Sequence, residues 1–342
     1  MTLTAPPHVV KRRQTGQAIG LDVGGTKIAG GVVATDGGVV ERIPVVPTPP
    51  KDEAATLAAL RQVIDELRAQ HPDVEAIGVG AAGLVDWPDG YIRWAPNNAY
   101  RALPLRQLLH DATGLPVVVD NDANTAAWAE ARLGASASYM AFLTIGTGVG
   151  GGLILGGQLY RGVTGIGAEV GHIVVDPDGP YRCGCGNVGC LEAVASGTAL
   201  GRYGREAAAT DPDGLLAKLA GGAANVTGET VFMAAQAGDQ TARSLFARLG
   251  RWLGIGIASL VTLYDFELIV IGGGAVAAGD LLLTPTRASF EQFVFARAHR
   301  QPPSIVAARL GAEAGWVGSA LLALDQEESS PDVTEAIAAV SP

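Results

Sequence analysis

The hydrophobic residues of this chain recur with two periods, which predict alternating strands and helices. Short aliphatic runs that end in glycine or polar clusters predict strands over residues 18–33 (a strand pair), 76–86 (ending in a glycine loop), 115–119, 139–143, 153–160, 266–271 and 304–309. Apolar residues three or four positions apart predict helices over residues 53–70, 104–113, 123–133, 240–264 and 314–324. A further helix should begin after Thr227, a plausible N-cap, with Glu229 in its first turn. This alternation is typical of an α/β fold.

Two stretches share one pattern, in which a glycine turn joins two aliphatic strands. Residues 21–26 (Leu-Asp-Val-Gly-Gly-Thr) align with residues 143–148 (Leu-Thr-Ile-Gly-Thr-Gly). The repeat suggests a duplicated fold of two domains with a central cleft. The bare N–H groups of such turns can wrap an anion, so two of them could grip a polyphosphate. Two other interpretations stay open: a tight turn without a ligand, and a chance likeness of strand-turn-strand pieces.

The glycine turns do not fit two better-known phosphate motifs. Gly146-x-Gly148-x-x-Gly151 matches the dinucleotide fingerprint in spacing, but a strand follows it where that motif needs a helix. The turn at residues 24–27 lacks the spacing of a P-loop. Residues 272–274 do lie between a strand and a helix, which suits the adenosine end of a nucleotide or simply a tight βα turn.

Cysteine occurs only between residues 183 and 190, as Cys183, Cys185 and Cys190, with His172 upstream. Three thiolates and one imidazole are the ligand set of a closed, structural zinc site. Clustered cysteines in a cytosolic chain are more often metal ligands than disulfides. The alternatives are a small buried group and a redox pair plus one further cysteine.

A polar cluster follows the strand over residues 115–119, where α/β folds place residues that face ligands. Within it, Asp122 could act as a general base that accepts a hydroxyl proton during phosphoryl transfer. The alternative is helix capping by Asn121 or Asp122, and both roles can hold together.

Composition narrows the class of protein further. The 342 residues are 48% hydrophobic, with a net charge of −10 and a pI near 5.0, which argues against nucleic-acid binding. No apolar run reaches the ~18 residues of a membrane span, and residues 1–17 lack the apolar core of a secretory signal. We therefore expect a cytoplasmic protein with no membrane partner. Residues 1–17 should form a disordered extension and residues 326–342 a solvated tail, in which residues 333–340 could form a helical turn.

In combination these motifs resemble the ROK family (repressors, open reading frames, kinases), in order from about residue 19 to 324. The resemblance lies in five segments: residues 22–27, 121–124, 146–148, 169–172 and 183–192. It is greatest toward actinobacterial-type glucokinases. It implies an actin/hexokinase-like (ribonuclease H-like) fold, with an N-terminal domain of residues 18–122 plus 305–325 and a C-terminal domain of residues 123–304 that carries the zinc motif. The segment before Asp22 is too short for a helix-turn-helix domain, so a repressor is not expected.

The resemblance further implies ATP-dependent phosphorylation of the 6-hydroxyl of a hexose, with glucose as the leading substrate. Asp122 would be the base, and the sugar would contact Gly83, Asn97, Asn121, Asp122, Glu169, His172 and Glu192. ATP and Mg²⁺ would bind at Asp22, Gly24, Gly25, Thr26, Lys27, Thr144, Gly146, Thr147, Gly148, Gly272, Gly273 and Gly274. Structural Zn²⁺ would be held by His172, Cys183, Cys185 and Cys190, and the protein would be a homodimer or homotetramer.

Zinc would affect sugar binding through residues that lie close in sequence to its ligands. Glu169 lies three residues before the ligand His172, and Glu192 lies two after Cys190. One ion would therefore orient both carboxylates, and zinc loss should weaken sugar binding.

Three departures from the family's glucokinases leave the sugar open. Residues 97–101 read Asn-Asn-Ala-Tyr-Arg where a hydrophobic-x-Trp-Arg run is usual after the asparagine, Ala82 stands where many members have proline, and residues 191–194 read Leu-Glu-Ala-Val instead of Trp-Glu-Gln-Tyr. The alternatives are a kinase for N-acetylmannosamine, N-acetylglucosamine or fructose, a glucokinase that uses polyphosphate, and a non-catalytic sugar sensor.

Overall fold

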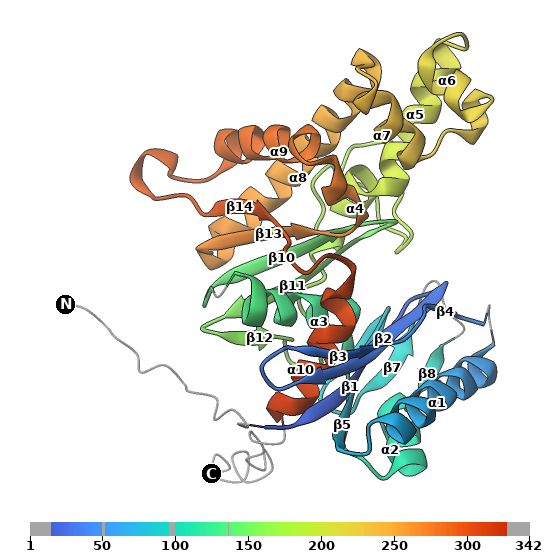
Figure 1. Cartoon of the computed structure of the whole chain (residues 1–342). Coiled ribbons are helices and arrows are strands. Elements are labelled where there is room, and N and C mark those ends of the chain that lie inside the picture. Colours follow the sequence, from blue (N-terminus) through green and yellow to red (C-terminus); the bar gives the residue numbers. More distant parts are fainter. Residues whose placement is uncertain (1–14, 50–51, 96–99, 136, 327–342) are drawn as a thin grey trace. The chain divides into compact units, whose positions relative to one another are not determined.

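The computed structural model describes residues 15–49, 52–95, 100–135 and 137–326, which form two compact units (Figure 1). Unit 1 contains the described residues up to Leu133, the segment Arg161–Gly167 and the residues from Glu313 onward. Unit 2 contains Gly134–Tyr160 and Ala168–Ala312. Each unit is therefore built from more than one stretch of the chain.

The main sheet of unit 1 has the order β3-β2-β1-β5-β9, and a short sixth strand, β4, pairs with β2. Its strands are β1 (Gln17–Val23), β2 (Lys27–Ala34), β3 (Val39–Arg42), β4 (Val46–Pro47), β5 (Val74–Ala81) and β9 (Val117–Asn121). β1, β2 and β3 pair antiparallel, whereas β1, β5 and β9 pair parallel. The small antiparallel sheet of β6 (Leu84–Asp86), β7 (Tyr91–Trp94) and β8 (Arg101–Leu103) completes the unit.

The sheet of unit 2 repeats this topology strand for strand. Its order is β12-β11-β10-β13-β14. The strands are β10 (Met140–Ile145), β11 (Val149–Leu155), β12 (Gln158–Tyr160), β13 (Leu268–Gly272) and β14 (Ser304–Ala307). The first two pairings are again antiparallel and the last two parallel. Both glycine turns thus join the second and third strands of equivalent sheets, which confirms the duplication expected from the sequence.

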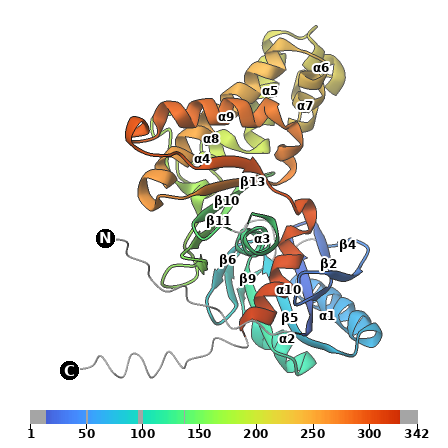
Figure 2. The ribbon, with the colours of Figure 1, turned by 60° about the vertical axis from the view of Figure 1, so that its left-hand side comes forward.

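Helices cover both faces of the unit 1 sheet (Figures 1 and 2). α1 (Glu53–Gln70) and α2 (Leu105–Thr113) lie on one face, where Leu60, Ile64 and Leu109 join the buried core of the strands. α3 (Asp122–Ala129) and α10 (Ala314–Gln326) lie on the other. Burial of these apolar side chains supplies most of the driving force that holds the layers together.

Glycines on the central strands allow α10 to pack directly on the sheet backbone. A Cβ atom at Gly78 would lie 1.8 Å from the carbonyl oxygen of Ser319, and one at Gly20 would lie 1.9 Å from that of Trp316. On the helix side, a Cβ atom at Gly318 would lie 1.8 Å from the carbonyl oxygen of Thr125 in α3. Side chains are thus excluded from this contact on both surfaces.

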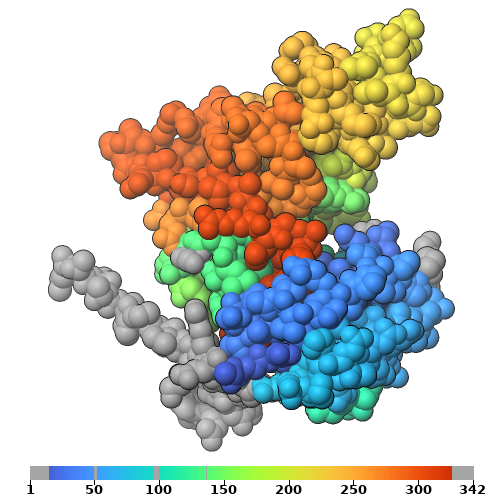
Figure 3. Space-filling view, in the orientation of Figure 1, coloured from blue at the N-terminus to red at the C-terminus, as the bar shows by residue number. Residues whose placement is uncertain are grey.

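The helices of unit 2 are α4 (Leu191–Ala195), α5 (Gly197–Thr210), α6 (Leu215–Ala220), α7 (Gly228–Gln236), α8 (Gln240–Tyr264) and α9 (Asp280–Phe293). Short 3-10 turns span Val170–His172, Ala223–Asn225, Gly274–Ala278 and Arg297–His299 in this unit, and Gly311–Glu313 precedes α10. In the space-filling view, α5–α7 form a lobe at one end of the unit (yellow in Figure 3).

One described helix, α8, is long and apolar enough, by length and composition alone, to cross a membrane. Its apolar side chains, among them Leu249, Leu253 and Ile257, are buried in the core of unit 2. A buried helix of a folded core passes the same test of composition.

The strongly periodic elements match the sequence prediction, with α1 and α8 at the expected residues. Three details differ. The helix expected over residues 123–133 ends at Ala129 and continues as a π-helical turn, Glu130–Gly134. The helix expected directly after Gly274 begins only at Asp280, behind a 3-10 turn. We expected domain boundaries after residues 122 and 304. Instead, α3 groups with unit 1, because it packs on α10, and β14 groups with unit 2, because it pairs with β13. The tail over residues 333–340 lies outside the described residues.

We expect Gly78→Ala to destabilise the protein by about 3 kcal/mol or more, because the added methyl group would overlap the α10 backbone. The midpoint of urea unfolding measures this cost. Gly146→Ala is the matched control: no atom lies within 4 Å of the added Cβ, so its cost should stay within about 0.5 kcal/mol. Equal stability of the two variants would contradict the close helix–sheet contact.

Candidate active site and metal centre

The four predicted zinc ligands converge in unit 2. Single donor atoms of His172, Cys183, Cys185 and Cys190 all lie within 4.8 Å of one another. The Sγ atoms of Cys185 and Cys190 are 3.6 Å apart, as are Cys183 Sγ and His172 Nδ1. Zinc bonds of about 2.3 Å to sulfur and 2.0 Å to nitrogen would place tetrahedral donors roughly 3.5–3.8 Å apart. The observed spacing therefore fits a four-coordinate zinc ion.

Backbone hydrogen bonds shape the loop that brings the cysteines together. The N–H of Cys183 donates to the carbonyl of Asn187 (2.7 Å), and the N–H of Gly186 donates to the carbonyl of Cys183 (3.0 Å). Gly189 has φ +72°, and a Cβ atom there would lie 1.8 Å from the carbonyl oxygen of Asp176. Burial raises the pKa of Cys183 to about 12. A bound cation would supply the charge that stabilises its thiolate.

A stack of aromatic and guanidinium groups holds this loop against α5 and α8. The guanidinium of Arg202 lies 3.8 Å from the ring centroid of Tyr181, and that of Arg248 lies 3.8 Å from the ring of Tyr203. The two tyrosine rings meet edge to face at 5.6 Å. Such contacts each contribute on the order of 1 kcal/mol. No sequence motif predicts these contacts, because the residues have no characteristic spacing.

The glycine hairpin of unit 2 has its carbonyl groups turned back into the protein. The N–H of Gly197 donates to the carbonyl of Gly146 (2.7 Å), and the hydroxyl of Thr198 donates to the carbonyl of Thr147 (2.7 Å). Gly146 N–H closes the turn on the carbonyl of Gly148 (3.0 Å). Among the described residues, the N–H groups of Thr147 and Gly148 have no acceptor. They are therefore the donors that remain for an anion.

The hairpin of unit 1 is also held through its carbonyl groups, by a different threonine and with one different carbonyl. Gly24 N–H closes the turn on the carbonyl of Lys27 (3.0 Å). Thr48 donates from its hydroxyl to the carbonyl of Gly24 (2.9 Å) and from its N–H to the carbonyl of Thr26 (3.0 Å). Within the described part of the chain, the N–H groups of Gly25 and Thr26 have no acceptor. Neither Thr48 nor Thr198 was predicted from the sequence, since each lies far from its hairpin along the chain.

Asp22 carries an unusual charge state for an aspartate. Burial, with a smaller contribution from the charge of Asp122, raises its pKa to about 7 against the opposing effect of Lys27. One of its carboxylate oxygens packs against α10, where a Cβ atom at Gly315 would lie 2.7 Å away. Asp22 and Asp122, predicted separately from two motifs, therefore interact within unit 1.

Asn121 is the N-cap of α3, and Asp122 is its first residue. The side-chain oxygen of Asn121 accepts from the N–H groups of Ala123 (2.9 Å) and Asn124 (3.3 Å). Its amide nitrogen donates to the carbonyl of Gly83 (3.1 Å). One N–H hydrogen of that amide is left for a ligand. Of the two capping alternatives, the structure selects Asn121.

The carboxylate of Asp122 is close to the helix N-terminus. One oxygen accepts from the N–H of Ala123 (2.9 Å), which lowers its pKa. Burial has the larger effect, so the pKa of Asp122 is raised overall. A carboxylate with raised proton affinity is suited to general base chemistry.

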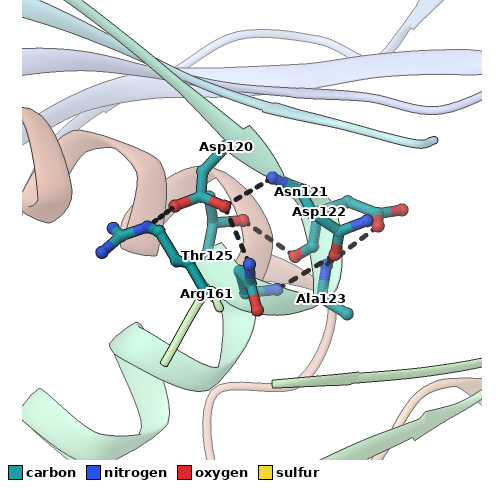
Figure 4. Close-up of polar contacts among 7 residues, drawn as sticks. Asp120, Asn121, Asp122, Ala123, Thr125 and Arg161 are labelled. Atoms are coloured by element: carbon teal, nitrogen blue, oxygen red, sulfur yellow. Dashed lines mark hydrogen bonds and ion pairs between the residues drawn. The ribbon is translucent and has the colours of Figure 1, made fainter. Parts of the chain in front are cut away.

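A buried ion pair supports this helix start (Figure 4). Asp120 binds Arg161 (Oδ2 to Nε, 2.6 Å) and accepts from the amide of Asn124 (2.9 Å). The Arg161 guanidinium stacks on the ring of Trp87 at 3.7 Å. Figure 4 shows Asp120 turned toward Arg161, with Asn121 and Asp122 on its other side. No sequence pattern predicts the role of Arg161, because it is distant along the chain from Asp120.

The remaining predicted sugar contacts are distributed as follows. Glu192 accepts the N–H of Val149 at Oε2 (3.0 Å), and a Cβ atom at Gly148 would lie 2.2 Å from that oxygen. Glu169 directly precedes the 3-10 turn that ends at His172. Gly83 has φ +123°. Asn97 lies outside the described residues.

Unit 2 contains a cavity of about 660 Å³ beside its hairpin. It is lined by Gly146, Thr147, Gly197, Thr198, Leu200, Gly201, Arg205, Thr227, Gly228, Glu229, Phe232, Phe246, Gly274, Ala275 and Ala278. A mostly apolar cavity of this size accommodates a small organic ligand. The N-terminus of α5 opens at its margin and favours negative charge there.

Three other predicted nucleotide residues shape the sheet behind this cavity. Thr144 pairs with Gly272 across β10 and β13. A Cβ atom at Gly273, which has φ +81°, would lie 2.5 Å from the carbonyl oxygen of Ile145. Of the three glycines 272–274, only Gly274 lines the cavity.

The duplicated sheets, the two hairpins and the cavity define a sugar kinase of the actin/hexokinase-like class, as comparison with known proteins supports. The sequence matches the ROK family over residues 18–326, so the chain belongs to that family. The glucokinase of Streptomyces coelicolor is 40% identical over 317 residues, 91% of this chain and 99% of that protein.

Two further relatives bear on the substrate. The crystal structure of a ROK family glucokinase from Streptomyces griseus in complex with glucose and AMPPNP is 42% identical, with a TM-score of 0.80, and the match covers 90% of this chain and 99% of that one. An N-acetylmannosamine kinase of Escherichia coli is 33% identical over 315 residues, 90% of this chain and 99% of that protein.

We expect stability to fall as pH rises, because of Asp22. With a pKa near 3.8 when unfolded and about 7 when folded, folded Asp22 binds more protons across that window, so stability decreases between these values. The free energy of unfolding of Asp22→Asn, relative to that of wild type, should therefore increase by roughly 2 kcal/mol as the pH rises from 5.5 to 8.5. Urea unfolding without nucleotide or magnesium measures the difference, and a gap independent of pH would contradict it.

We expect one zinc ion per chain in the purified protein, measured by elemental analysis. Cys185→Ser should reduce zinc to a small fraction and lower the melting temperature, because three ligands bind far more weakly than four. Ser244→Ala, which changes an exposed residue of α8, should keep full zinc and the wild-type melting temperature. Wild-type zinc in Cys185→Ser would contradict the ligand set.

Proposed function

We propose that this protein is an ATP-dependent sugar kinase that phosphorylates the 6-hydroxyl of glucose. The observation that carries the proposal is the unit 2 cavity, bordered by a glycine hairpin whose free N–H groups suit a phosphate. The 40% identity to a Streptomyces glucokinase supports glucose as the acceptor.

The residues proposed to bind the nucleotide come from the hairpins of both units. The adenosine end occupies the unit 2 cavity beside Gly274, and Gly272 and Gly273 hold the sheet behind it. Thr144, Gly146, Thr147 and Gly148 provide the phosphate turn in unit 2. The corresponding turn in unit 1 is Gly24, Gly25, Thr26 and Lys27. Asp22 would hold magnesium through a water molecule, and the ion would supply positive charge that offsets the charge of the phosphates.

Asp122 accepts the proton of the 6-hydroxyl as the new O–P bond forms. The raised pKa of Asp122 brings its proton affinity closer to that needed by a general base. Phosphoryl transfer otherwise depends on positioning and charge neutralisation. The remaining sugar hydroxyls bind Gly83, Asn97, Asn121, Glu169, His172 and Glu192.

His172 connects the metal centre to the sugar. Its Nδ1 atom faces Cys183, so Nε2 is left to bond a sugar hydroxyl. Zinc would be structural: four protein ligands leave no open position for chemistry.

The second candidate is the same kinase acting on an N-acetylated amino sugar, which the 33% identity to an N-acetylmannosamine kinase favours. In either case we propose a cytoplasmic homodimer or homotetramer. The cytosol supplies ATP and keeps the three cysteines reduced for metal binding.

The proposal is tested by ADP release with ATP and magnesium across glucose, mannose, fructose, N-acetylglucosamine and N-acetylmannosamine. We expect kcat/KM for glucose to exceed that for each other sugar at least tenfold. A preference for an acetylated sugar would establish the second candidate. Absence of turnover with every sugar, together with measurable sugar binding, would identify a sensor.

The base assignment predicts that Asp122→Asn lowers kcat by about 10²–10⁴-fold, the usual contribution of general base catalysis. Glucose affinity should change much less, since the amide keeps an acceptor for the Ala123 N–H. Isothermal titration with glucose and the coupled assay separate the two effects. Near wild-type turnover would exclude Asp122 as the base.

A further inference from the structure

The phosphate hairpin of unit 2 (residues 146–149) is joined by three hydrogen bonds to the segment that follows the last zinc ligand. Val149 N–H donates to Glu192 Oε2 (3.0 Å) and Gly197 N–H to the carbonyl of Gly146 (2.7 Å). The Thr198 hydroxyl donates to the carbonyl of Thr147 (2.7 Å). All three partners come from residues 192–198, directly after Cys190.

The segment and the hairpin are closely packed against each other. A Cβ atom at Gly148 would lie 2.2 Å from Glu192 Oε2, and one at Gly197 would lie 2.8 Å from the carbonyl oxygen of Gly146. No side chain can therefore separate them, and a shift of one requires a shift of the other.

The other end of the segment is held at the metal centre. Cys190 is fully buried and is the N-cap of α4. Leu191 N–H donates to the carbonyl of Ile173 (2.9 Å), one residue after His172. The second oxygen of Glu192, Oε1, lies 3.5 Å from Cys183 Sγ. Glu192 thus contacts a zinc ligand with one oxygen and the hairpin with the other.

This connection controls which backbone groups the hairpin presents. In a trans peptide the C=O and the following N–H point in opposite directions. When Gly197 and Thr198 hold the carbonyls of Gly146 and Thr147, the N–H groups of Thr147 and Gly148 point away from α5 and are left for a phosphate.

We propose that the zinc-anchored segment, residues 190–198, positions the phosphate hairpin, so that zinc supports nucleotide binding as well as sugar binding. Glu192 and Thr198 are the positioning residues. The inference rests on the proposed function, because the hairpin must bind the triphosphate.

Thr198 provides the cleaner test, since Glu192 also has a proposed role at the sugar. Thr198→Val should raise the Kd of AMPPNP with Mg²⁺ about fivefold to tenfold, as expected for one neutral hydrogen bond. Binding of glucose should stay within twofold, and Thr198→Ser should restore the AMPPNP Kd. Thr210→Val is the matched control, because it removes a similar hydroxyl-to-carbonyl bond (2.8 Å) in the same helix.

Zinc dependence is tested on chelator-treated protein shown to be zinc-free and still folded by circular dichroism. Its Kd for AMPPNP should rise by a similar factor. The further rise in the AMPPNP Kd when zinc is removed should be smaller in Thr198→Val than in wild type. It should be undiminished in Thr48→Val, which alters the hairpin of unit 1, whereas the zinc ligands belong to unit 2. An unchanged AMPPNP Kd in the zinc-free protein, or in zinc-replete Thr198→Val, would overturn the inference.

If chelation unfolds the chain, hydrogen exchange measured on zinc-replete protein replaces the binding measurement on zinc-free protein. The Val149 amide and its hairpin neighbours should exchange faster in Thr198→Val than in Thr210→Val, and equal rates would overturn the inference. Failure of zinc-replete wild type to bind AMPPNP at all would instead overturn the proposed function, and this inference with it.

Discussion

The site depends on the direction in which a few backbone carbonyl groups point. A protein with a net charge of −10 gains little from its overall charge when it binds a polyphosphate, so local dipoles must supply the attraction. In both units a threonine hydroxyl turns a carbonyl of the glycine hairpin back into the protein: Thr48 in unit 1 and Thr198 in unit 2. If both hairpins bind phosphate as proposed, the duplicated fold uses the same kind of contact twice to expose backbone N–H groups.

The metal centre compensates for a segment that has little hydrophobic core of its own. Around Cys183 and Cys190 the buried cluster is small, and Tyr181 is its main aromatic contact. A metal ion there would cross-link the loop, and the stacked arginines add a second attachment to α5 and α8. Because α4 and α5 begin immediately after this loop, its rigidity is passed to the hairpin through Glu192 and Thr198.

The two acidic residues of unit 1 show how a functional site lowers stability. Burial and mutual repulsion hold the pKa of Asp22 at about 7, and burial also raises the pKa of Asp122. Neither arrangement favours folding at neutral pH. The cost is met elsewhere in the unit, through the close packing of α10 on Gly20 and Gly78 and through the Asp120–Arg161 pair.

The sequence alone determined the α/β class, the duplication, the family and the four residues that the structure brings together as a possible metal site. These follow from local patterns, namely the hydrophobic period, the glycine turns and the cysteine spacing. Such patterns can be recognised without knowing the tertiary contacts. Only the tertiary structure decided that Asn121 is the helix cap, that Arg161 supports Asp120, and that Glu192 binds the hairpin backbone. Each of these contacts depends either on the exact hydrogen-bond geometry or on distant segments of the chain coming together. Neither of these produces a recognisable pattern in the sequence.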